Sequence, residues 1–276
     1  QLIWFSFLVS LVVALTVFLF GESGRPGGVL GNPNFLSAYL LLNFFLALYF
    51  LQIYWRERQI IWIGFLTGGL ILQLLVIFLA QTRGVFLGLG AGLLLVVWLW
   101  LWRQKKLFAQ LFLMVILIIG GVFWQTRDLS FWRNLPGLDR FSKVELQSAL
   151  PRLNAWSASW RGFKDKPFLG WGWENFNKVA NKYYDPKLGR ERGGDLFFSK
   201  PHSILIEYLV SGGVLLLIAF LILTAAYFYE SKSFLLWGWW LAYLISNLFS
   251  FDSFGTYLML VLVLAMVDFK FKNHGQ

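Results

Sequence analysis

Residues 83–102 read RGVFLGLGAGLLLVVWLWLW, one arginine followed by a run without any charged residue. About twenty apolar residues cross the roughly 30 Å hydrocarbon core of a bilayer as a helix. The whole chain has the same character, because 58% of its 276 residues are hydrophobic and 14% are charged, against about 25% charged residues in soluble domains. The composition therefore predicts an integral membrane protein.

Further runs of membrane length surround this one. The eight predicted spans cover Leu2–Phe20, 35–54, Ile60–Ala80, 83–102, 107–124, 202–228, 234–250 and 254–269. They predict an all-α fold, a polytopic transmembrane helical bundle with five spans over 1–124, one large external loop over 125–201 that contains short amphipathic helices, and three spans with a short tail over 202–276. Because Gln1 already lies inside an apolar run, we expect a truncated bundle with further spans upstream.

Basic residues indicate which connections face the cytoplasm. The connections at 56–58, 103–106 and Lys232 and the C-terminal tail all carry Lys or Arg, and the positive-inside rule assigns such short loops to the cytoplasm. The loop over 125–201 is then external, although it holds more than half of the chain's 24 Lys and Arg residues, because long loops cross largely regardless of charge. A loop of this length is rarely kept without a function, so chemistry is expected there.

The formal net charge of +10 indicates anionic partners. Basic residues alternate with the spans and form no single soluble patch, which argues against nucleic acid and favours membrane lipids and phosphates. The chain has no cysteine, its external acids are dispersed, and it carries no zinc-hydrolase, nucleophile-elbow, P-loop or D-x-D pattern. We therefore expect no cofactor and no metal, and charge stabilisation by Arg and Lys.

Arg83 stands at the predicted external start of a span. Thr82 precedes it and can cap the helix, while Gly84, Gly88 and Gly92 follow at four-residue spacing and allow a neighbouring helix to approach closely. A helix N-terminus beside an arginine is a candidate anion site, because backbone N–H groups and the guanidinium point to the same place. The alternative is an arginine that only extends to the membrane interface.

Within the loop, Arg152 opens a segment with the periodicity of an amphipathic helix lying on the membrane surface. Three aromatic residues share one face of this predicted helix: Trp156, Trp160 and Phe163. A turn rich in Pro and Gly is expected over 165–173, and a second short helix over 174–184. The alternative for the aromatic residues is anchoring at the interface, and for Arg152 and Arg161 it is a solvated face.

The sequence FSKPHS at 198–203 leads into the next span. Ser199 is a candidate N-cap and Pro201 suits a first helical turn. His202 would then feel the positive end of the helix dipole, which disfavours its protonation and keeps it a potential base. Glu207 would be an ionisable group inside a membrane helix. The alternatives are an interfacial histidine and a buried glutamate paired with an arginine.

Together these motifs resemble the O-antigen ligase and polymerase superfamily. The resemblance rests on the order of TRG at Thr82, R-x-x-x-W at Arg152, DKPFLGWG at Asp165, PHS-x-L-x-E at Pro201 and a trailing Gly-Gly at Gly212, with GNPN at Gly31 before them. It covers most of the chain, and the specificity lies in the order across a large loop. This chain has His-Ser where many members have His-Asn. Members usually have about a dozen spans.

The resemblance implies a membrane glycosyltransferase of the bacterial inner membrane with its large loop facing the periplasm. It would move a glycan from an undecaprenyl-diphosphate carrier to a lipid A core, a protein or a growing polymer. Arg83 and Arg152 would bind the diphosphate, and His202 would assist or position the acceptor hydroxyl. The further candidate substrate-binding residues are Arg161, Glu207, Trp156, Trp160, Trp171 and Trp173, of which the tryptophans offer stacking faces for a sugar.

Two other classes of function remain open from the sequence. Some relatives of this family carry a bicarbonate-transporter label, so a small-anion transporter is the main alternative. A transporter would place its binding groups near the bilayer midplane on broken helices or internal repeats, whereas the polar groups here gather at one predicted face. A structural scaffold would leave the basic loop without a role.

Overall fold

The computed structural model describes residues 2–20, 24–134, 146–183 and 200–274, and every regular element within these ranges is a helix. The predicted all-α class is thus confirmed. The chain forms two compact units. The bundle unit comprises Gln1–Lys143, Glu230–Ser246 and Asp252–Gln276, and the loop unit comprises Val144–Tyr229 and Asn247–Phe251.

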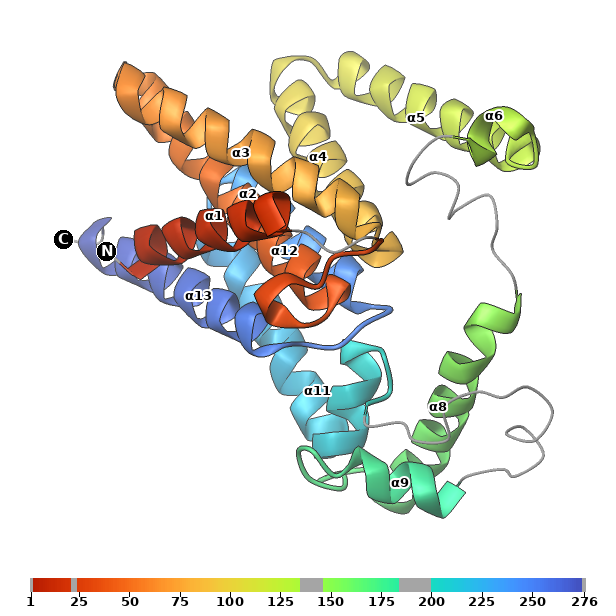
Figure 1. The fold of residues 1–276 in the computed structure, drawn as a ribbon. Coiled ribbons are helices and arrows are strands. Elements are labelled where there is room, and N and C mark those ends of the chain that lie inside the picture. Colours follow the sequence, from red (N-terminus) through yellow and green to blue (C-terminus); the bar gives the residue numbers. More distant parts are fainter. Residues whose placement is uncertain (1, 21–23, 135–145, 184–199, 275–276) are drawn as a thin grey trace. The chain divides into compact units, whose positions relative to one another are not determined.

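Figure 1 draws the elements of both units and labels their α-helices. Those of the bundle unit are α1 (Leu2–Phe20), the 3-10 turn η1 (Gly28–Leu30), α2 (Pro33–Arg56), α3 (Ile60–Ala80), α4 (Arg83–Gln104), α5 (Lys106–Thr126), α6 (Ser130–Arg133), nearly all of α12 (Phe234–Asn247), and α13 (Phe254–His274). Those of the loop unit are α8 (Leu146–Asp165), α9 (Phe176–Tyr183) and all but the last residue of α11 (Ile204–Glu230).

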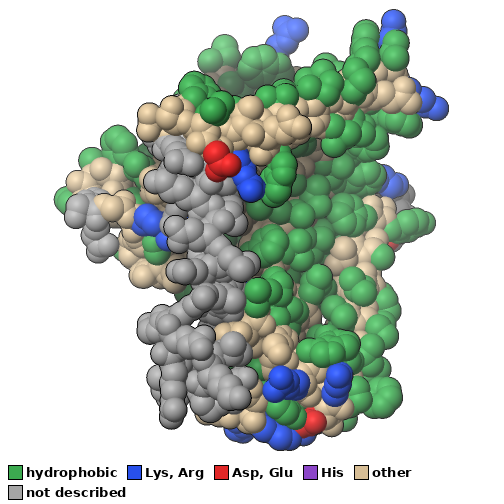
Figure 2. Space-filling model, turned by 90° about the vertical axis from the view of Figure 1, so that its right-hand side faces the viewer, with side chains coloured by type: hydrophobic (Ala, Val, Ile, Leu, Met, Phe, Trp, Pro, Cys, Tyr) green, Lys and Arg blue, Asp and Glu red, His purple; other side chains and the backbone are tan. Residues whose placement is uncertain are grey.

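Six helices are long and apolar enough to cross a membrane: α1, α2, α3, α4, α5 and α11. Hydrophobic side chains dominate the described surface on the face seen in Figure 2, as expected for surface in contact with lipid. The prediction of eight spans is therefore confirmed for six. The other two segments are helical but shorter. α12 has 14 residues, about 21 Å of helix against a core of roughly 30 Å, and the apolar part of α13 is Phe254–Val267.

α2 is the central helix of the bundle unit. It packs against α1, α3, α4 and α13, and 72% of its most apolar window is buried. The GNPN motif explains where it begins. Gly31 has a φ of 68°, the side chain of Asn32 accepts a hydrogen bond from the backbone N–H of Asn34, and Pro33 occupies the first turn, where a missing N–H costs nothing.

Buried polar side chains connect α2 to its neighbours. The Tyr39 hydroxyl donates to the Ser6 carbonyl oxygen of α1 at 3.0 Å, and the Ser6 hydroxyl donates to the Asn43 side-chain oxygen at 3.4 Å. On α12, the indole N–H of Trp239 donates to the Leu42 carbonyl at 3.0 Å. Such bonds specify helix partners in an apolar interior, where the hydrophobic effect discriminates little between apolar faces.

The glycine stripe of α4 lies against α12, as its spacing predicts. A Cβ added at Gly88 would lie 2.6 Å from the Ala242 carbonyl oxygen, and one added at Gly92 would lie 2.4 Å from the Phe45 ring and 2.6 Å from the Gly238 carbonyl oxygen. Gly90, on another face of α4, would meet nothing within 4 Å. The two backbones therefore approach closely because Gly88 and Gly92 carry no side chain.

α11 is interrupted, which the predicted continuous span over 202–228 did not anticipate. Gly213 has φ 66° and ψ −165°, outside the helical region. The freed backbone groups bond to the DKPFLGWG turn. The N–H groups of Trp171 and Gly172 donate to the carbonyls of Val210 and Ser211, and the Val214 N–H donates to the Pro167 carbonyl, each at 2.8 Å. The turn thus satisfies the polar groups that the break exposes.

Substitution of the α4 glycines tests this packing. We expect Gly92→Ala to destabilise the protein by about 1–3 kcal/mol, because the new methyl group overpacks the contact with α12. Gly90→Ala is the matched control and should stabilise the protein by up to about 1 kcal/mol, since alanine favours a helix over glycine. Thermal unfolding in detergent measures both, and equal effects of the two variants would contradict the packing described.

Candidate functional site

The segment from Lys200 to Ser203 precedes α11 rather than forming its first turn. α11 begins at Ile204, and the Ser203 carbonyl accepts the first helical bond from the Glu207 N–H at 2.8 Å. His202 has a φ of 55°, in the left-handed region, so it cannot continue a right-handed helix. The prediction that Pro201 and His202 lie in the first turn is therefore wrong. Ser199, the predicted N-cap, lies outside the described residues.

His202 is held between α8 and the short segment that joins α12 to α13. The indole N–H of Trp156 donates to the Pro201 carbonyl at 2.9 Å, which ties the residue before His202 to α8. The imidazole lies edge-on to the Phe251 ring, with centroids 5.3 Å apart and planes at 66°. His202 is partly buried. Phe251 packs against its ring, and Trp156 hydrogen-bonds to the residue before it.

Electrostatics favour the neutral form of this histidine. Burial lowers the pKa of His202, and the positive charge of Arg152 lowers it further. Arg152 stands one helical turn before Trp156 on α8, so the R-x-x-x-W spacing places both on one face. Burial also lowers the pKa of Arg152, from a starting value so high that the guanidinium stays charged. Burial and Arg152, and not membership in a helix turn, therefore favour the neutral form of His202.

Lys200 joins two carboxylates. Its ammonium lies 2.6 Å from a carboxylate oxygen of Glu207 and 2.6 Å from one of Glu174. The side chains of Glu207 and Lys200 are 4% and 12% exposed, against 66% for Glu174. Burial disfavours the charge on Lys200, but hydrogen bonds from both carboxylates and attraction to them outweigh burial and raise its pKa. The partner of Glu207 is thus a lysine and not an arginine.

Sequence reasoning missed Lys200 and Glu174 as members of the site. Glu174 has a φ of 60°, like His202 in the left-handed region. Such backbone strain, about 1–3 kcal/mol for each residue, persists only where surrounding contacts enforce it. Lys200 precedes Glu207 by seven residues, but no helical periodicity relates them because the helix starts between them. Only the tertiary fold brings these three side chains together.

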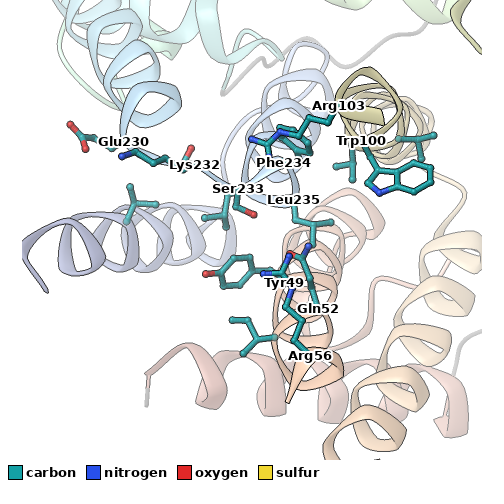
Figure 3. Close-up of a pocket in the computed structure, with 16 residues that line it drawn as sticks. Tyr49, Gln52, Arg56, Trp100, Arg103, Glu230, Lys232, Ser233, Phe234 and Leu235 are labelled. Atoms are coloured by element: carbon teal, nitrogen blue, oxygen red, sulfur yellow. The ribbon is translucent and has the colours of Figure 1, made fainter. Parts of the chain in front are cut away.

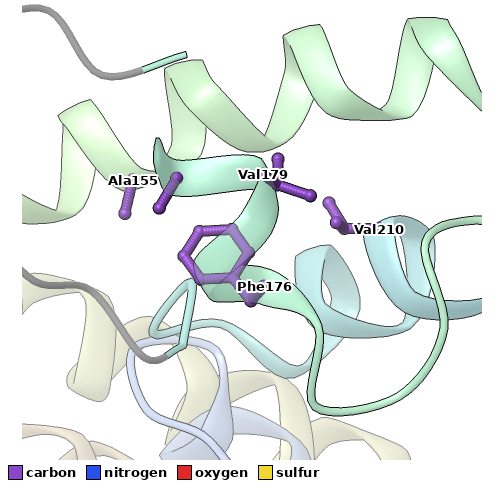
Figure 4. Packing of buried hydrophobic residues seen from close by; sticks show 5 residues of the cluster. Ala155, Phe176, Val179 and Val210 are labelled. Atoms are coloured by element: carbon purple, nitrogen blue, oxygen red, sulfur yellow. The ribbon is translucent and has the colours of Figure 1, made fainter. Parts of the chain in front are cut away.

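A small apolar cluster positions α8 and α9 against the first half of α11. Its buried members, most of them drawn in Figure 4, are Ala155, Phe176, Val179, Ala180 and Val210. The carboxylate of Asp165, at the end of α8, accepts hydrogen bonds from Lys182 and Tyr183 of α9, and these bonds hold the pKa of Asp165 low. The predicted short helix at 174–184 is confirmed as α9, within slightly narrower bounds.

The four candidate tryptophans have different environments. The indole N–H groups of Trp156 and Trp171 donate to the backbone carbonyls of Pro201 and Gly162, respectively. Trp171 is also covered by the ammonium groups of two lysines at 4.5 and 5.2 Å from its ring centroid. Trp160 and Trp173 are 53% and 41% exposed. The exposed pair, together with exposed Arg161 on α8, offers surface for a ligand.

In the bundle unit, Arg83 is the first residue of α4 and its Nε atom is buried. Thr82 occupies the N-cap position, but its side chain makes no capping bond, which corrects that prediction. Its hydroxyl lies 3.0 Å from the Ser37 hydroxyl of α2 instead. Sequence reasoning also missed Arg25, whose guanidinium donates to the Ala80 carbonyl at 3.0 Å and the Thr82 hydroxyl at 3.5 Å. Two arginines therefore stand near the start of α4.

These groups define what the described residues can do chemically. The loop unit presents a charged arginine, a partly buried neutral imidazole and exposed aromatic faces, a combination suited to an anion and a hydroxyl. No cluster of three or more His, Cys, Asp or Glu side chains placed to hold a metal ion occurs in the part of the chain that the structure describes. The fold is that of a multi-pass membrane protein.

Comparison with known proteins identifies the family. Residues 68–221 match the family model described as O-antigen ligase. This range covers more than half of the 276 residues and includes Arg83, Arg152 and His202. The chain belongs to the O-antigen ligase family, whose members are membrane enzymes of the glycan ligase and polymerase type, and the resemblance seen in its motifs is confirmed. No curated protein matches the chain significantly.

Removal of Lys200 tests the buried charge pair. We expect Lys200→Met to destabilise the protein by about 3 kcal/mol or more, because Glu207 is left buried without its cation. The double variant Lys200→Met with Glu207→Gln should recover most of the loss, since no unpaired charge remains. Glu174→Gln, at the exposed carboxylate, should cost less than about 1 kcal/mol. Chemical unfolding in detergent measures all three, and an equal loss in the single and double variants would contradict the pairing.

Proposed function

We propose that this protein is a glycosyltransferase that moves a glycan from an undecaprenyl-diphosphate carrier to an acceptor at the external face of the bacterial inner membrane. The observation that carries the proposal is the partly buried His202, kept neutral by burial and by the positive charge of Arg152. Family membership supports the reaction class. The apolar helices would keep the carrier's polyprenyl tail in the bilayer.

The leaving group explains why the site needs arginines. As the bond between the sugar's anomeric carbon and the carrier oxygen breaks, the electron pair stays with the diphosphate and its negative charge grows. A fixed guanidinium stabilises this charge without reorganising. We assign this role to Arg152 in the loop unit. We assign the same role to Arg83, because its TRG motif matches that of the family. Arg83 also begins α4, where backbone N–H groups favour an anion.

The acceptor explains why the histidine must be neutral. The acceptor hydroxyl attacks the anomeric carbon and gives up its proton, for which only a neutral imidazole has a free lone pair. The positive charge of Arg152 thus acts twice, on the leaving diphosphate and on the protonation state of His202. Arg152 opposes protonation of His202 until the leaving diphosphate neutralises the guanidinium.

The glycan would contact the exposed aromatic side chains. Trp160 and Trp173 offer stacking faces for sugar rings, and Arg161 offers hydrogen-bond donors. Trp156 and Trp171 are proposed to support the fold and not to contact the glycan, because their indole N–H groups donate to backbone carbonyls. Glu207 is likewise proposed to orient Lys200 and the segment that carries His202. Acceptors that fit this proposal are a lipid, a protein and the end of a growing polymer.

The break in α11 bears on the alternative of an anion transporter. Transporters expose the free backbone groups of broken helices to their substrate near the bilayer midplane. At Gly213 the carbonyls of Val210 and Ser211 and the N–H of Val214 are bonded to the chain's own turn at 167–172. These groups are therefore engaged within the protein, and the break favours a structural role over a transport site.

Substitution of the proposed site residues tests the transferase. Arg83→Ala should lower glycan transfer on the order of a hundredfold or more, because a fixed cation is lost at the leaving group. His202→Ala should lower it by about 100- to 10,000-fold, because the base is lost. Transfer of labelled glycan from the lipid carrier in membranes measures the effect. The control is Lys178→Ala, at an exposed position of α9. Normal transfer by both site variants at normal membrane levels would refute the assignment.

The pH dependence tests the pairing of His202 with Arg152. Since the pKa of His202 is lowered, transfer should persist below pH 6.5, the ordinary histidine value, and fall only as pH drops through that lowered pKa and the base becomes protonated. Arg152→Gln removes the nearby positive charge, so the pKa of His202 should rise. NMR titration of labelled histidine, assigned with His202→Gln, measures the shift. An unchanged or lower pKa in Arg152→Gln would contradict the electrostatic coupling.

A further inference from the structure

The bundle unit contains a cavity of about 690 Å³ far from the start of α4. Figure 3 shows polar and aromatic side chains around it from α2, α4 and the segment that leads into α12. Arg56 is the last residue of α2, and Arg103 is the penultimate residue of α4. The volume falls within the roughly 300–1,000 Å³ typical of sites for small ligands.

The cavity lies at the opposite end of α4 from Arg83. Twenty residues separate Arg83 from Arg103, which corresponds to about 30 Å along a helix, close to the thickness of the hydrocarbon core. One arginine therefore stands at each boundary of the bilayer if α4 spans it. The basic connections at this end are those that the charge pattern assigns to the cytoplasm.

The polar lining of the cavity is suited to an anion. Three cations, Arg56, Arg103 and Lys232, face one carboxylate, that of Glu230. Among the described residues no carboxylate pairs with any of the three cations. The Arg103 guanidinium lies over the Phe234 ring, with its central carbon 4.0 Å from the centroid, a cation–π contact that uses no N–H group in an ion pair.

A buried hydroxyl provides an independent sign of a ligand. Ser231 lines the cavity and is 3% exposed, yet its hydroxyl oxygen has no hydrogen-bond partner within the described part of the chain. Buried polar groups nearly always have a partner, because an unsatisfied one costs about 1–3 kcal/mol. A phosphate oxygen in the cavity would supply this partner.

The rest of the wall is apolar and indicates what carries the phosphate. Val96, Val97 and Trp100 of α4 line it together with Leu236 and Val267. A free phosphate ion would leave such a wall in water, whereas acyl chains would cover it. The excess of cations over carboxylates selects a net negative head group over a zwitterionic one.

We propose that this cavity binds an anionic phospholipid, with its phosphate between Arg56, Arg103 and the Ser231 hydroxyl and its acyl chains along the valine wall of α4. The site shares no residue with the proposed transfer site, and it stands whether or not the protein transfers glycans. Cations that merely extend to the interface would give a diffuse attraction to anionic lipid with no preference for these positions.

A matched pair of double variants tests the proposal. Arg56→Gln with Arg103→Gln removes two cations from the cavity. Lys105→Gln with Lys106→Gln removes two exposed cations from the neighbouring connection, neither of which lines it. Native mass spectrometry of the delipidated, detergent-purified protein, titrated with phosphatidylglycerol or phosphatidylcholine, measures the bound lipid. Circular dichroism checks that each variant is folded.

We expect the protein and the Lys105/Lys106 variant to retain one phosphatidylglycerol in preference to phosphatidylcholine, and the Arg56/Arg103 variant to bind it at least about tenfold more weakly. Val97→Trp keeps every charge but fills the apolar wall, and it should also weaken binding. Equal weakening by the two double variants, or equal retention of the two lipids, would overturn the proposal. Displacement of the lipid by millimolar inorganic phosphate, with Val97→Trp unimpaired, would overturn it in favour of a free-phosphate site.

Discussion

In a bilayer every backbone N–H and C=O group must find its partner inside the protein, because hydrocarbon offers none. This constraint is most demanding where a helix breaks, and α11 breaks at Gly213. The DKPFLGWG turn supplies two donors and one acceptor to the exposed groups. The turn can approach so closely because Gly170 and Gly213 lack side chains. A Cβ at Gly170 would lie 2.4 Å from the Val210 carbonyl oxygen.

The position of His202 depends on this arrangement. The bonded turn holds the first half of α11 against α8 and α9, and His202 precedes that half by two residues. Trp156 of α8 hydrogen-bonds to the Pro201 carbonyl in the segment that carries His202, and Lys200 of the same segment forms an ion pair with buried Glu207. Several motifs that include candidate substrate contacts therefore also support the segment that carries the strained His202. In the proposed mechanism the chemistry falls to Arg83, Arg152 and the imidazole.

Local patterns predicted much of the candidate site and missed what nonlocal folding created. The four-residue step from Arg152 to Trp156 and the glycine stripe of α4 both have a fixed period, so a helix places their members on one face. Arg25 and Lys200 have no such relation to their partners, which lie in other elements. The start of α11 was also misplaced, because Pro201 fits a first turn while the left-handed φ of His202 delays the helix.

The sequence by itself determined that this is an all-helical membrane protein of the O-antigen ligase family, since apolar length sets membrane-crossing helices and the order of its motifs carries the family resemblance. The tertiary structure decided which groups meet. The tertiary fold paired Glu207 with a lysine, and it placed the Trp171 indole N–H where it donates to a backbone carbonyl. It also gathered arginines from two helix ends around one cavity. Such contacts depend on how elements far apart in sequence pack, which no local period encodes.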